Sequence, residues 1–204
     1  MSTYKDIFDR NIDRVKGLCA LYNSLKINKI KEGKEYKSTD ILRSATVFLH
    51  SSFEEYFRNV LREALPRICT QEDLQKISFI TKEGKHIEKL AVSSLVQYRG
   101  KNIDDLIADF IGDTLDSTSF NNYSDIINWA QKIKVDLSAF TAQEKIEKLI
   151  QRRHKIVHEA DNNKTDKMKS EYSLTPIKEY IVKEWLDAVQ DLVSIIDAQI
   201  GGNS

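Results

Sequence analysis

Hydrophobic residues recur every three or four positions through several long segments of the chain, and this periodicity predicts α-helices. The first segment spans residues 4–26. In the second, residues 39–65, apolar positions cover well over half of the helical circumference, which is typical of a helix that packs against neighbours on several sides. We therefore expect residues 39–65 to form the central helix, with Ser38 or Thr39 as its N-cap and Pro66 at its end.

Two more long helices are predicted in the second half of the chain. Thr141 and Glu144 have the spacing of a capping box, which predicts the start of a helix over residues 142–159. The polar, turn-rich segment that follows should end this helix. Thr175 is the expected N-cap of the last helix, with Pro176 in its first turn, and the glycines from residue 201 are expected to stop it.

The stretch between the second and third long helices, residues 67–138, contains only short periodic segments. We expect brief helices within it that open near residues 70, 85, 102 and 124. Strand-like alternation is nowhere long enough to predict a sheet, so the expected fold class is all-α. The whole chain, residues 1–204, is interpreted as one domain in which residues 67–138 form a helical insertion in a bundle.

Composition adds few constraints. The 204 residues include 31 Lys and Arg and 31 Asp and Glu, so the formal net charge is zero and any nucleic acid must bind a local patch. Cys19 and Cys69 lack the spacing of a metal site, and both are expected to be reduced and packed. The chain has no run of about 20 apolar residues, and its polar start lacks the apolar run of a signal peptide, which predicts a soluble, cytoplasmic protein without membrane contact.

The third long helix carries a charge where its pattern requires an apolar residue. At roughly 100° per residue, one stripe about 120° wide holds Ile146, Leu149, Ile150, Ile156, Val157 and Ala160. Arg153 falls in the middle of this stripe. Because a guanidinium stays protonated, it needs an anion, a carboxylate or a wet cleft between subunits. His158 follows five residues later, roughly 140° around an ideal helix, so it does not share a face with Arg153.

The segment Arg153-His154-Lys155-Ile156-Val157-His158 resembles the Arg-x4-His signature of the HEPN superfamily (higher eukaryotes and prokaryotes nucleotide-binding). The match includes the polar residue directly after the arginine. The helix over residues 39–65, with Ser52-Phe53-Glu54-Glu55-Tyr56-Phe57, is similar to the second helix of stand-alone bacterial HEPN proteins of the RiboL-PSP-associated branch. The resemblance spans most of the chain and implies a HEPN-like helical bundle.

This resemblance implies a metal-independent endoribonuclease that needs no cofactor. In such enzymes two subunits pack their motif helices together, so Arg153 and His158 of both chains of a homodimer would line one cleft. His158 would act as general base or acid, because an imidazole exchanges protons near neutral pH, and Arg153 would bind the scissile phosphate. His154 would assist by hydrogen bonding, while Arg152 and Lys155 would contact the RNA backbone.

Three acidic residues are further candidates for a supporting role. Glu159 and Asp161 are expected to orient an imidazole, to pair with an arginine, or to be solvated at the helix end. HEPN proteins often place a polar residue of the second helix near the cleft, and the resemblance suggests Glu55 for this position. Glu54 and Arg58 have the i,i+4 spacing that is typical of a solvated face.

Stand-alone HEPN ribonucleases commonly act as toxins or antiphage-defence effectors, so the resemblance implies RNA and an operon-encoded antitoxin or other inhibitor as partners. Two other functions remain open. His154 and His158, at i and i+4, share a helical face as two zinc ligands of a hydrolase would, although the pattern supplies no third ligand. The bundle could instead be a non-catalytic interaction or regulatory module that keeps the dimer without cutting RNA.

Overall fold

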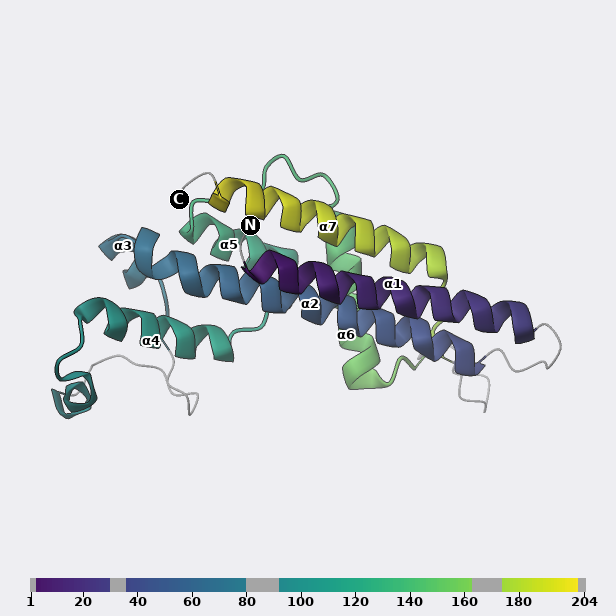
Figure 1. Cartoon of the computed structure of the whole chain (residues 1–204), viewed down its shortest axis with the longest axis horizontal. Helices are drawn as coiled ribbons and strands as arrows, with labels where there is room; N and C mark the ends of the chain where they lie inside the picture. Colours follow the sequence, from purple (N-terminus) through teal and green to yellow (C-terminus); the bar gives the residue numbers. More distant parts are fainter. Residues whose placement is uncertain (1–2, 30–35, 80–91, 163–173, 202–204) are drawn as a thin grey trace.

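The computed structural model describes residues 3–29, 36–79, 92–162 and 174–201 (Figure 1). These residues form helices α1 (Thr3–Lys29), α2 (Tyr36–Ile68), α3 (Gln71–Gln75), α4 (Ile103–Ser117), α5 (Tyr123–Lys132), α6 (Gln143–Glu159) and α7 (Glu179–Gly201), with a 3-10 helix, η1, at Val92–Tyr98. Within these ranges, the β pairing is a single isolated antiparallel bridge between Asn162 and Leu174. The all-α prediction is therefore confirmed.

Helix α2 lies at the centre of the bundle, as its broad apolar surface predicts. It contacts α1, α4, α5, α6 and α7. Figure 1 shows α1 and α7 running alongside it, α4 beside its C-terminal half, and α6 crossing the bundle steeply. Its most deeply buried residues lie on several sides of the helix and include Leu42, Leu49, Phe57, Leu61 and Leu65. This helix therefore connects the core to every other long element.

Aromatic side chains of α2 form the middle of the core. The ring of Phe57 packs against Phe53, with the centroids 5.7 Å apart, and edge-on against Phe120, at 5.0 Å. On the α1 side, Tyr56 meets Phe8 at 5.5 Å. Tilted and edge-on ring pairs add attraction beyond the burial of apolar area. They fix α1 and the loop between α4 and α5 against α2.

The ends of α2 differ from the prediction. The helix begins at Tyr36, so Ser38 and Thr39 lie within its first turn and neither is the N-cap. It also continues through Pro66 to Ile68. A proline in the last turn removes one backbone hydrogen bond, but Leu65 is completely buried and Ile68 packs against the core. Apolar packing on both sides of the proline therefore favours the longer helix.

The start of α7 was predicted wrongly, and α6 begins within one residue of its predicted start but without the predicted cap. Helix α6 follows Ala142 as N-cap without a side-chain capping bond, so the expected capping box does not form, and Glu144 instead pairs with Lys148 at 2.7 Å. Helix α7 begins at Glu179. The expected cap, Thr175, lies before it in a segment whose backbone is used by tertiary hydrogen bonds.

Three of the four short helices predicted between α2 and α6 are present. Thr70 and Asp73 form a reciprocal capping box at α3, and Asn102 is the N-cap of α4. Helix α5 lies within one residue of its predicted start. The helix predicted from residue 85 falls largely outside the described residues, and its last part is η1. No helix in the described ranges has the length and apolar character that a membrane span requires.

Candidate functional site

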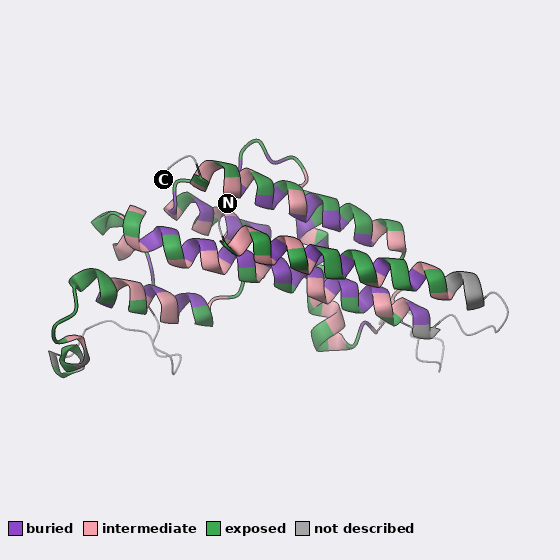
Figure 2. Cartoon of the chain, in the orientation of Figure 1, coloured by how far each residue is buried: buried purple, intermediate pink, exposed green. Residues whose placement is uncertain are grey.

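Helix α6 carries the Arg-x4-His segment and leaves the core towards its C-terminal end. Its first half is anchored by Ile146, Leu149 and Ile150, which are all buried. Beyond Ile150, no residue of α6 is fully buried, and Val157 is 48% exposed. The change from buried to half-buried and exposed positions is visible along this helix in Figure 2. Within one chain, the predicted apolar stripe is therefore buried only in its first half.

The two histidines of the motif lie side by side. The ring centroids of His154 and His158 are 4.5 Å apart, with 42° between the ring planes, as expected for side chains one helical turn apart. Both residues are exposed. A substrate in solution can therefore reach either imidazole, and an imidazole is suited to proton transfer near neutral pH.

Arg153 is half-buried on α6. Its charge contributes to lowering the pKa of Glu54 on α2. Its Nε atom is buried and has no hydrogen-bond partner in the described part of the chain. A guanidinium N–H that has lost water without gaining a partner favours the binding of an anion. The Nε atom of Arg153 is such a group within the motif.

Glu54 is the carboxylate that the structure brings near Arg153, and the sequence analysis missed it. Its side chain is only 13% exposed, and its Oε2 atom lies 3.4 Å from Nδ1 of the buried His50. Its Oε1 atom accepts a hydrogen bond of 3.3 Å from the backbone amide of Phe120. Burial raises the pKa of Glu54, but interactions with His50, Phe120 and Arg153 together lower it below its ordinary value. Glu54 is therefore ionised at neutral pH.

Glu55, the residue that the family resemblance suggested, contacts a different helix. It is exposed, and its carboxylate accepts a hydrogen bond of 3.3 Å from Asn11 on α1. The predicted solvated face is also wrong for Glu54 and for Arg58, which donates hydrogen bonds to the carbonyls of Leu115 and Thr118 at 2.9 and 3.0 Å. A histidine and a glutamate four residues apart within the apolar part of α2, His50 and Glu54, were the available signal.

Arg152 and Asp161 pair with each other at the end of α6. The Nη2 atom of Arg152 lies 2.8 Å from Oδ2 of Asp161, and Nε of Arg43 lies 2.5 Å from the same oxygen. Burial lowers the pKa of Arg152, and Asp161 itself is 1% exposed. Of the roles considered for Asp161, the structure shows pairing with arginine. The guanidinium of Arg152, which we expected at the RNA backbone, is instead part of this buried cluster.

Lys155 and Glu159 close the last turn of α6 through their backbones. The carbonyl of Lys155 accepts a hydrogen bond of 3.0 Å from the amide of Asp161, and that of Glu159 accepts one of 3.1 Å from Asn162. Both residues are half-buried. The predicted contact of the Lys155 side chain with RNA and the supporting role of Glu159 remain predictions.

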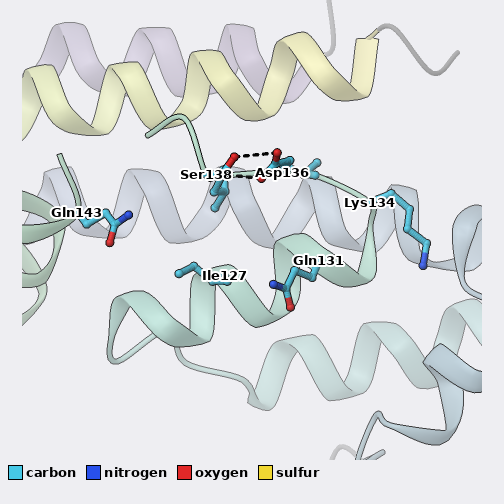
Figure 3. Close-up of a pocket in the computed structure, with 8 residues that line it drawn as sticks. Ile127, Gln131, Lys134, Asp136, Ser138 and Gln143 are labelled. Carbon is cyan, nitrogen blue, oxygen red and sulfur yellow. Dashed lines mark hydrogen bonds between the residues drawn. The ribbon is translucent and has the colours of Figure 1, made fainter. Parts of the chain in front are cut away.

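A hollow of about 370 Å³ lies near the opposite end of α6, bounded by α5 and the loop that follows it (Figure 3). Its lining residues are Ile127, Gln131, Lys134, Val135, Asp136, Leu137, Ser138 and Gln143. Its charged groups already have partners: Lys134 lies 3.2 Å from Asp73, and Asp136 accepts hydrogen bonds of 2.8 Å from Ser138. Gln143 precedes Arg153 by ten residues, about 15 Å along a helix, so this hollow is separate from the motif.

The arrangement at the end of α6 provides acid–base groups and a cation, and it offers few metal ligands. Within the described ranges, no three His, Cys, Asp or Glu side chains lie close enough together to hold a metal ion. His154 and His158 thus have no third protein ligand among these residues. The available groups are two exposed imidazoles, a type of side chain suited to proton transfer, and, on the same helix, a guanidinium, a type of side chain suited to binding anions.

An all-α bundle with a central second helix and an Arg-x4-His segment on a projecting helix end defines a protein of the HEPN class. The family model for RiboL-PSP-HEPN matches residues 9–202, nearly the whole chain, and the protein belongs to this family. No curated protein and no solved structure matches the chain. Membership in a HEPN family is consistent with a nuclease-type module that acts on RNA.

Proposed function

We propose that this protein is a metal-independent endoribonuclease that cleaves RNA through Arg153 and His158. The observation that carries the proposal is the state of Arg153: its Nε atom is buried without a hydrogen-bond partner in the described residues, on the helix that exposes two imidazoles. A buried guanidinium N–H without a hydrogen-bonding partner costs free energy in the empty protein. Binding of a phosphodiester would recover that cost, which supports phosphate as the natural partner.

The proposed reaction is an internal transesterification. One imidazole removes the proton of the ribose 2′-hydroxyl, whose oxygen attacks the adjacent phosphorus, and the bond from phosphorus to the 5′-oxygen breaks. A second acid protonates the leaving oxygen, so the products carry a 2′,3′-cyclic phosphate and a 5′-hydroxyl. We assign His158 as base or acid, His154 as its assisting neighbour, and Arg153 as the group that stabilises charge on the phosphorane-like transition state.

Two charged residues beside the motif have different roles in this proposal. Glu54 balances part of the charge of Arg153 and orients its guanidinium, because its carboxylate accepts a hydrogen bond from the amide of Phe120 and lies 3.4 Å from Nδ1 of His50. Lys155, half-buried near the end of α6, contacts the RNA backbone. Arg152 is left out of the RNA contacts because its guanidinium is bound to Asp161.

We further propose that the complete site forms between two copies of the chain. The second half of the apolar stripe of α6 is not fully buried in one chain, and Val157 is 48% exposed between the two motif histidines. A homodimer that packs two α6 ends together would cover Val157 and bring both motifs into one cleft. In the cell, such an enzyme would serve as a cytoplasmic toxin or antiphage-defence effector, held in check by an antitoxin or another operon-encoded inhibitor.

The experiment compares the full-length protein with Arg153→Ala and His158→Ala on RNA, with the 2′,3′-cyclic phosphate ends as the readout. Loss of a proton-transfer group or of the phosphate-binding cation should slow cleavage by about 10²- to 10⁴-fold. Arg67→Ala is the matched control, because Arg67 is an exposed arginine at the end of α2 and should leave the rate unchanged. Equal cleavage by the wild type and both motif variants would assign the activity to another site or to a contaminant.

The same preparation separates the two other functions. A zinc hydrolase that uses His154 and His158 as ligands, the pair whose rings are 4.5 Å apart, would contain stoichiometric zinc and lose activity in a chelator. Cleavage that persists in chelator supports the proposed mechanism. A folded dimer that binds RNA without producing new ends would indicate a non-catalytic module.

A further inference from the structure

A buried ionic cluster joins three parts of the fold at the C-terminal end of α6. Asp161 is 1% exposed, and its Oδ2 atom accepts from Nε of Arg43 on α2 and from Nη2 of Arg152 on α6. The two arginines also converge on the segment before α7, where the carbonyl of Thr175 accepts 3.0 Å and 2.7 Å hydrogen bonds from them. One carboxylate therefore ties α2, α6 and the approach to α7 together.

The cluster holds the backbone in a conformation that its residues do not favour on their own. Ala160 and Asp161 have φ angles of 48° and 57°, so two consecutive residues with a Cβ atom adopt the left-handed region where glycine is usual. In this turn the backbone amide of Asp161 donates a hydrogen bond to the carbonyl of Lys155. The carbonyl of Asp161 accepts a hydrogen bond of 2.9 Å from the amide of Thr175. Such strain persists only where surrounding contacts determine the conformation, and the Asp161 carboxylate supplies those contacts.

The two residues held in this cluster at the end of α6 lie on either side of the motif in the sequence. Arg152 immediately precedes Arg153, and Asp161 follows His158 by three residues. Anchoring the side chain of Arg152 fixes the rotation of α6 about its axis at Arg153. The contacts of the Asp161 carboxylate keep the last turn of α6 from fraying. The backbone at His158 is therefore fixed, and so is the direction in which its side chain leaves the helix. Both ends of the Arg-x4-His segment are therefore tied to the same carboxylate.

We infer that Asp161, clamped by Arg43 and Arg152, is a positioning residue that sets the placement of His158 relative to Arg153. This inference rests on the proposed function for its catalytic consequence. Asp161 contacts no substrate in this scheme. It acts through the helix end, so its loss should affect the catalytic step more than RNA binding.

The test substitutes Asp161→Asn in the full-length protein and measures kcat and KM for RNA cleavage, together with the NMR shifts of the His154 and His158 ring protons. An amide keeps the shape but does not neutralise two guanidinium groups. A misplaced proton-transfer group lowers kcat by about tenfold to a hundredfold while KM stays within about twofold. The contact between the two rings, 4.5 Å in the structure, should loosen and shift their ring protons.

Asp116→Asn is the matched control, because Asp116 also pairs with an arginine of α2, Arg62, but on an exposed surface far along the chain from the motif. It should leave kcat and both sets of ring signals unchanged. Arg43→Lys is the second test variant, because it keeps the charge but cannot reach Asp161 and Thr175 with a planar fork. If Asp161→Asn does not fold, Arg43→Lys tests the inference in its place. The same loss of kcat and the same shifts of the ring protons are expected for it.

Wild-type kcat and unchanged ring signals in a folded Asp161→Asn or Arg43→Lys protein would overturn the positioning role while leaving the proposed ribonuclease intact. A wild-type protein that cuts no RNA would remove the proposed function instead. In that case the ring signals alone decide whether Asp161 positions His158, since they require no turnover. A proportional rise in KM with unchanged kcat would also overturn the inference, because it would place Asp161 in RNA binding.

Discussion

Glu54 is the residue whose charge depends most clearly on its neighbours at the proposed site. Burial raises its pKa from the ordinary value of 4.5, and the interactions with His50, Phe120 and Arg153 outweigh burial and lower it. Two of these neighbours, His50 on α2 and Arg153 on α6, carry or can carry positive charge. Glu54 thereby links the buried part of α2 to the motif arginine through a carboxylate that stays ionised at neutral pH.

Glu54→Gln should lower the rate of RNA cleavage, because a neutral amide no longer attracts and orients the guanidinium of Arg153. A loss of about tenfold in kcat is expected for a misplaced phosphate-binding group. Glu55→Gln is an unusually close control: the same substitution one position later, at an exposed residue that bonds to Asn11 on α1. Equal rates for the two variants would exclude Glu54 from the site.

The stability contributed by Glu54 should depend on pH in a defined direction. Because its pKa is lower in the folded chain than the ordinary 4.5, ionised Glu54 stabilises the fold above about pH 4.5, and this contribution is lost as the pH falls through the folded value. Protonated glutamate resembles glutamine. The difference in unfolding free energy between wild type and Glu54→Gln, from urea titrations, should therefore shrink between pH 7 and pH 3. A difference that grows towards acid pH would contradict the lowered pKa.

The adjacent residues Glu54 and Glu55 show where sequence patterns lose information. Adjacent residues of a helix point about 100° apart, so one position decides which neighbouring helix a side chain meets. On α2, apolar residues surround most of the circumference, and the direction of the core is then poorly defined by periodicity. The sequence predicted the right helix, but only its packing against α6 and α1 separates the two carboxylates.

At the scale of the elements, helix existence was predictable, and helix ends only in part. The capping residues Thr70 and Asn102 are used as predicted, whereas Thr141 and Thr175 do not cap a helix. At Thr175 the physical reason is visible: its carbonyl accepts hydrogen bonds from Arg43 and Arg152, and its hydroxyl donates to the carbonyl of Asp161. Arg43 and Asp161 are 118 positions apart, and no local pattern contains such a contact.

Ala160→Gly should stabilise the protein by about 1 kcal/mol, because the left-handed conformation that ends α6 carries a steric penalty for any residue with a Cβ atom. Ala160 has a φ angle of 48° and an exposed side chain, so removing the methyl group loses little packing. Thermal and urea unfolding measure the change. The matched substitution Ala20→Gly, at an exposed position inside α1, should destabilise by about the same amount, since glycine is unfavourable in a helix interior. A destabilising Ala160→Gly would mean that the turn is not strained.

At the scale of the whole molecule, α2 packs against the other helices of the bundle and also against the segment between α2 and α6, which we interpret as an insertion. Phe120, in the loop between α4 and α5, is completely buried and packs edge-on against Phe57 of α2. The carboxylate of Glu54 accepts a hydrogen bond from the backbone amide of Phe120. The loop therefore contributes both to the core and to the placement of the residue beside Arg153, which connects this region to the proposed site.

Phe120→Ala should reduce the unfolding free energy by about 3–5 kcal/mol, the usual cost of removing a large aromatic side chain from a packed core. Tyr180→Ala, at a position that is 56% exposed on α7, should change it by less than about 0.5 kcal/mol. Denaturant titrations of the two variants measure both values. A small effect of Phe120→Ala would mean that this loop packs only loosely against α2 in solution.

The motif itself was predictable because its residues follow one another on one helix. Whether one chain or two chains supply the groups of the complete site cannot be read from that helix alone. The charge of Arg153 acts on Glu54 of α2, and His158 lies on an exposed part of α6 with His154. The two groups point in directions about 140° apart on an ideal helix. In the proposed dimer, Arg153 of one subunit and His158 of the other would bind the same phosphodiester, and this proposal makes a quantitative prediction about mixtures.

Arg153→Ala and His158→Ala proteins, each inactive alone, should recover activity when mixed and allowed to exchange subunits. In equal amounts, about half of the dimers are mixed, and in each mixed dimer one of the two Arg153/His158 pairs of the shared cleft is intact. About a quarter of the wild-type activity is therefore expected for a twofold assembly. A site built within one chain would recover none, because every chain lacks one group. Mixing Arg153→Ala with the double variant Arg153→Ala/His158→Ala controls for contamination, since no pairing of these chains supplies an arginine at the motif. Recovery in the first mixture and not in the second would establish that the catalytic groups come from different subunits.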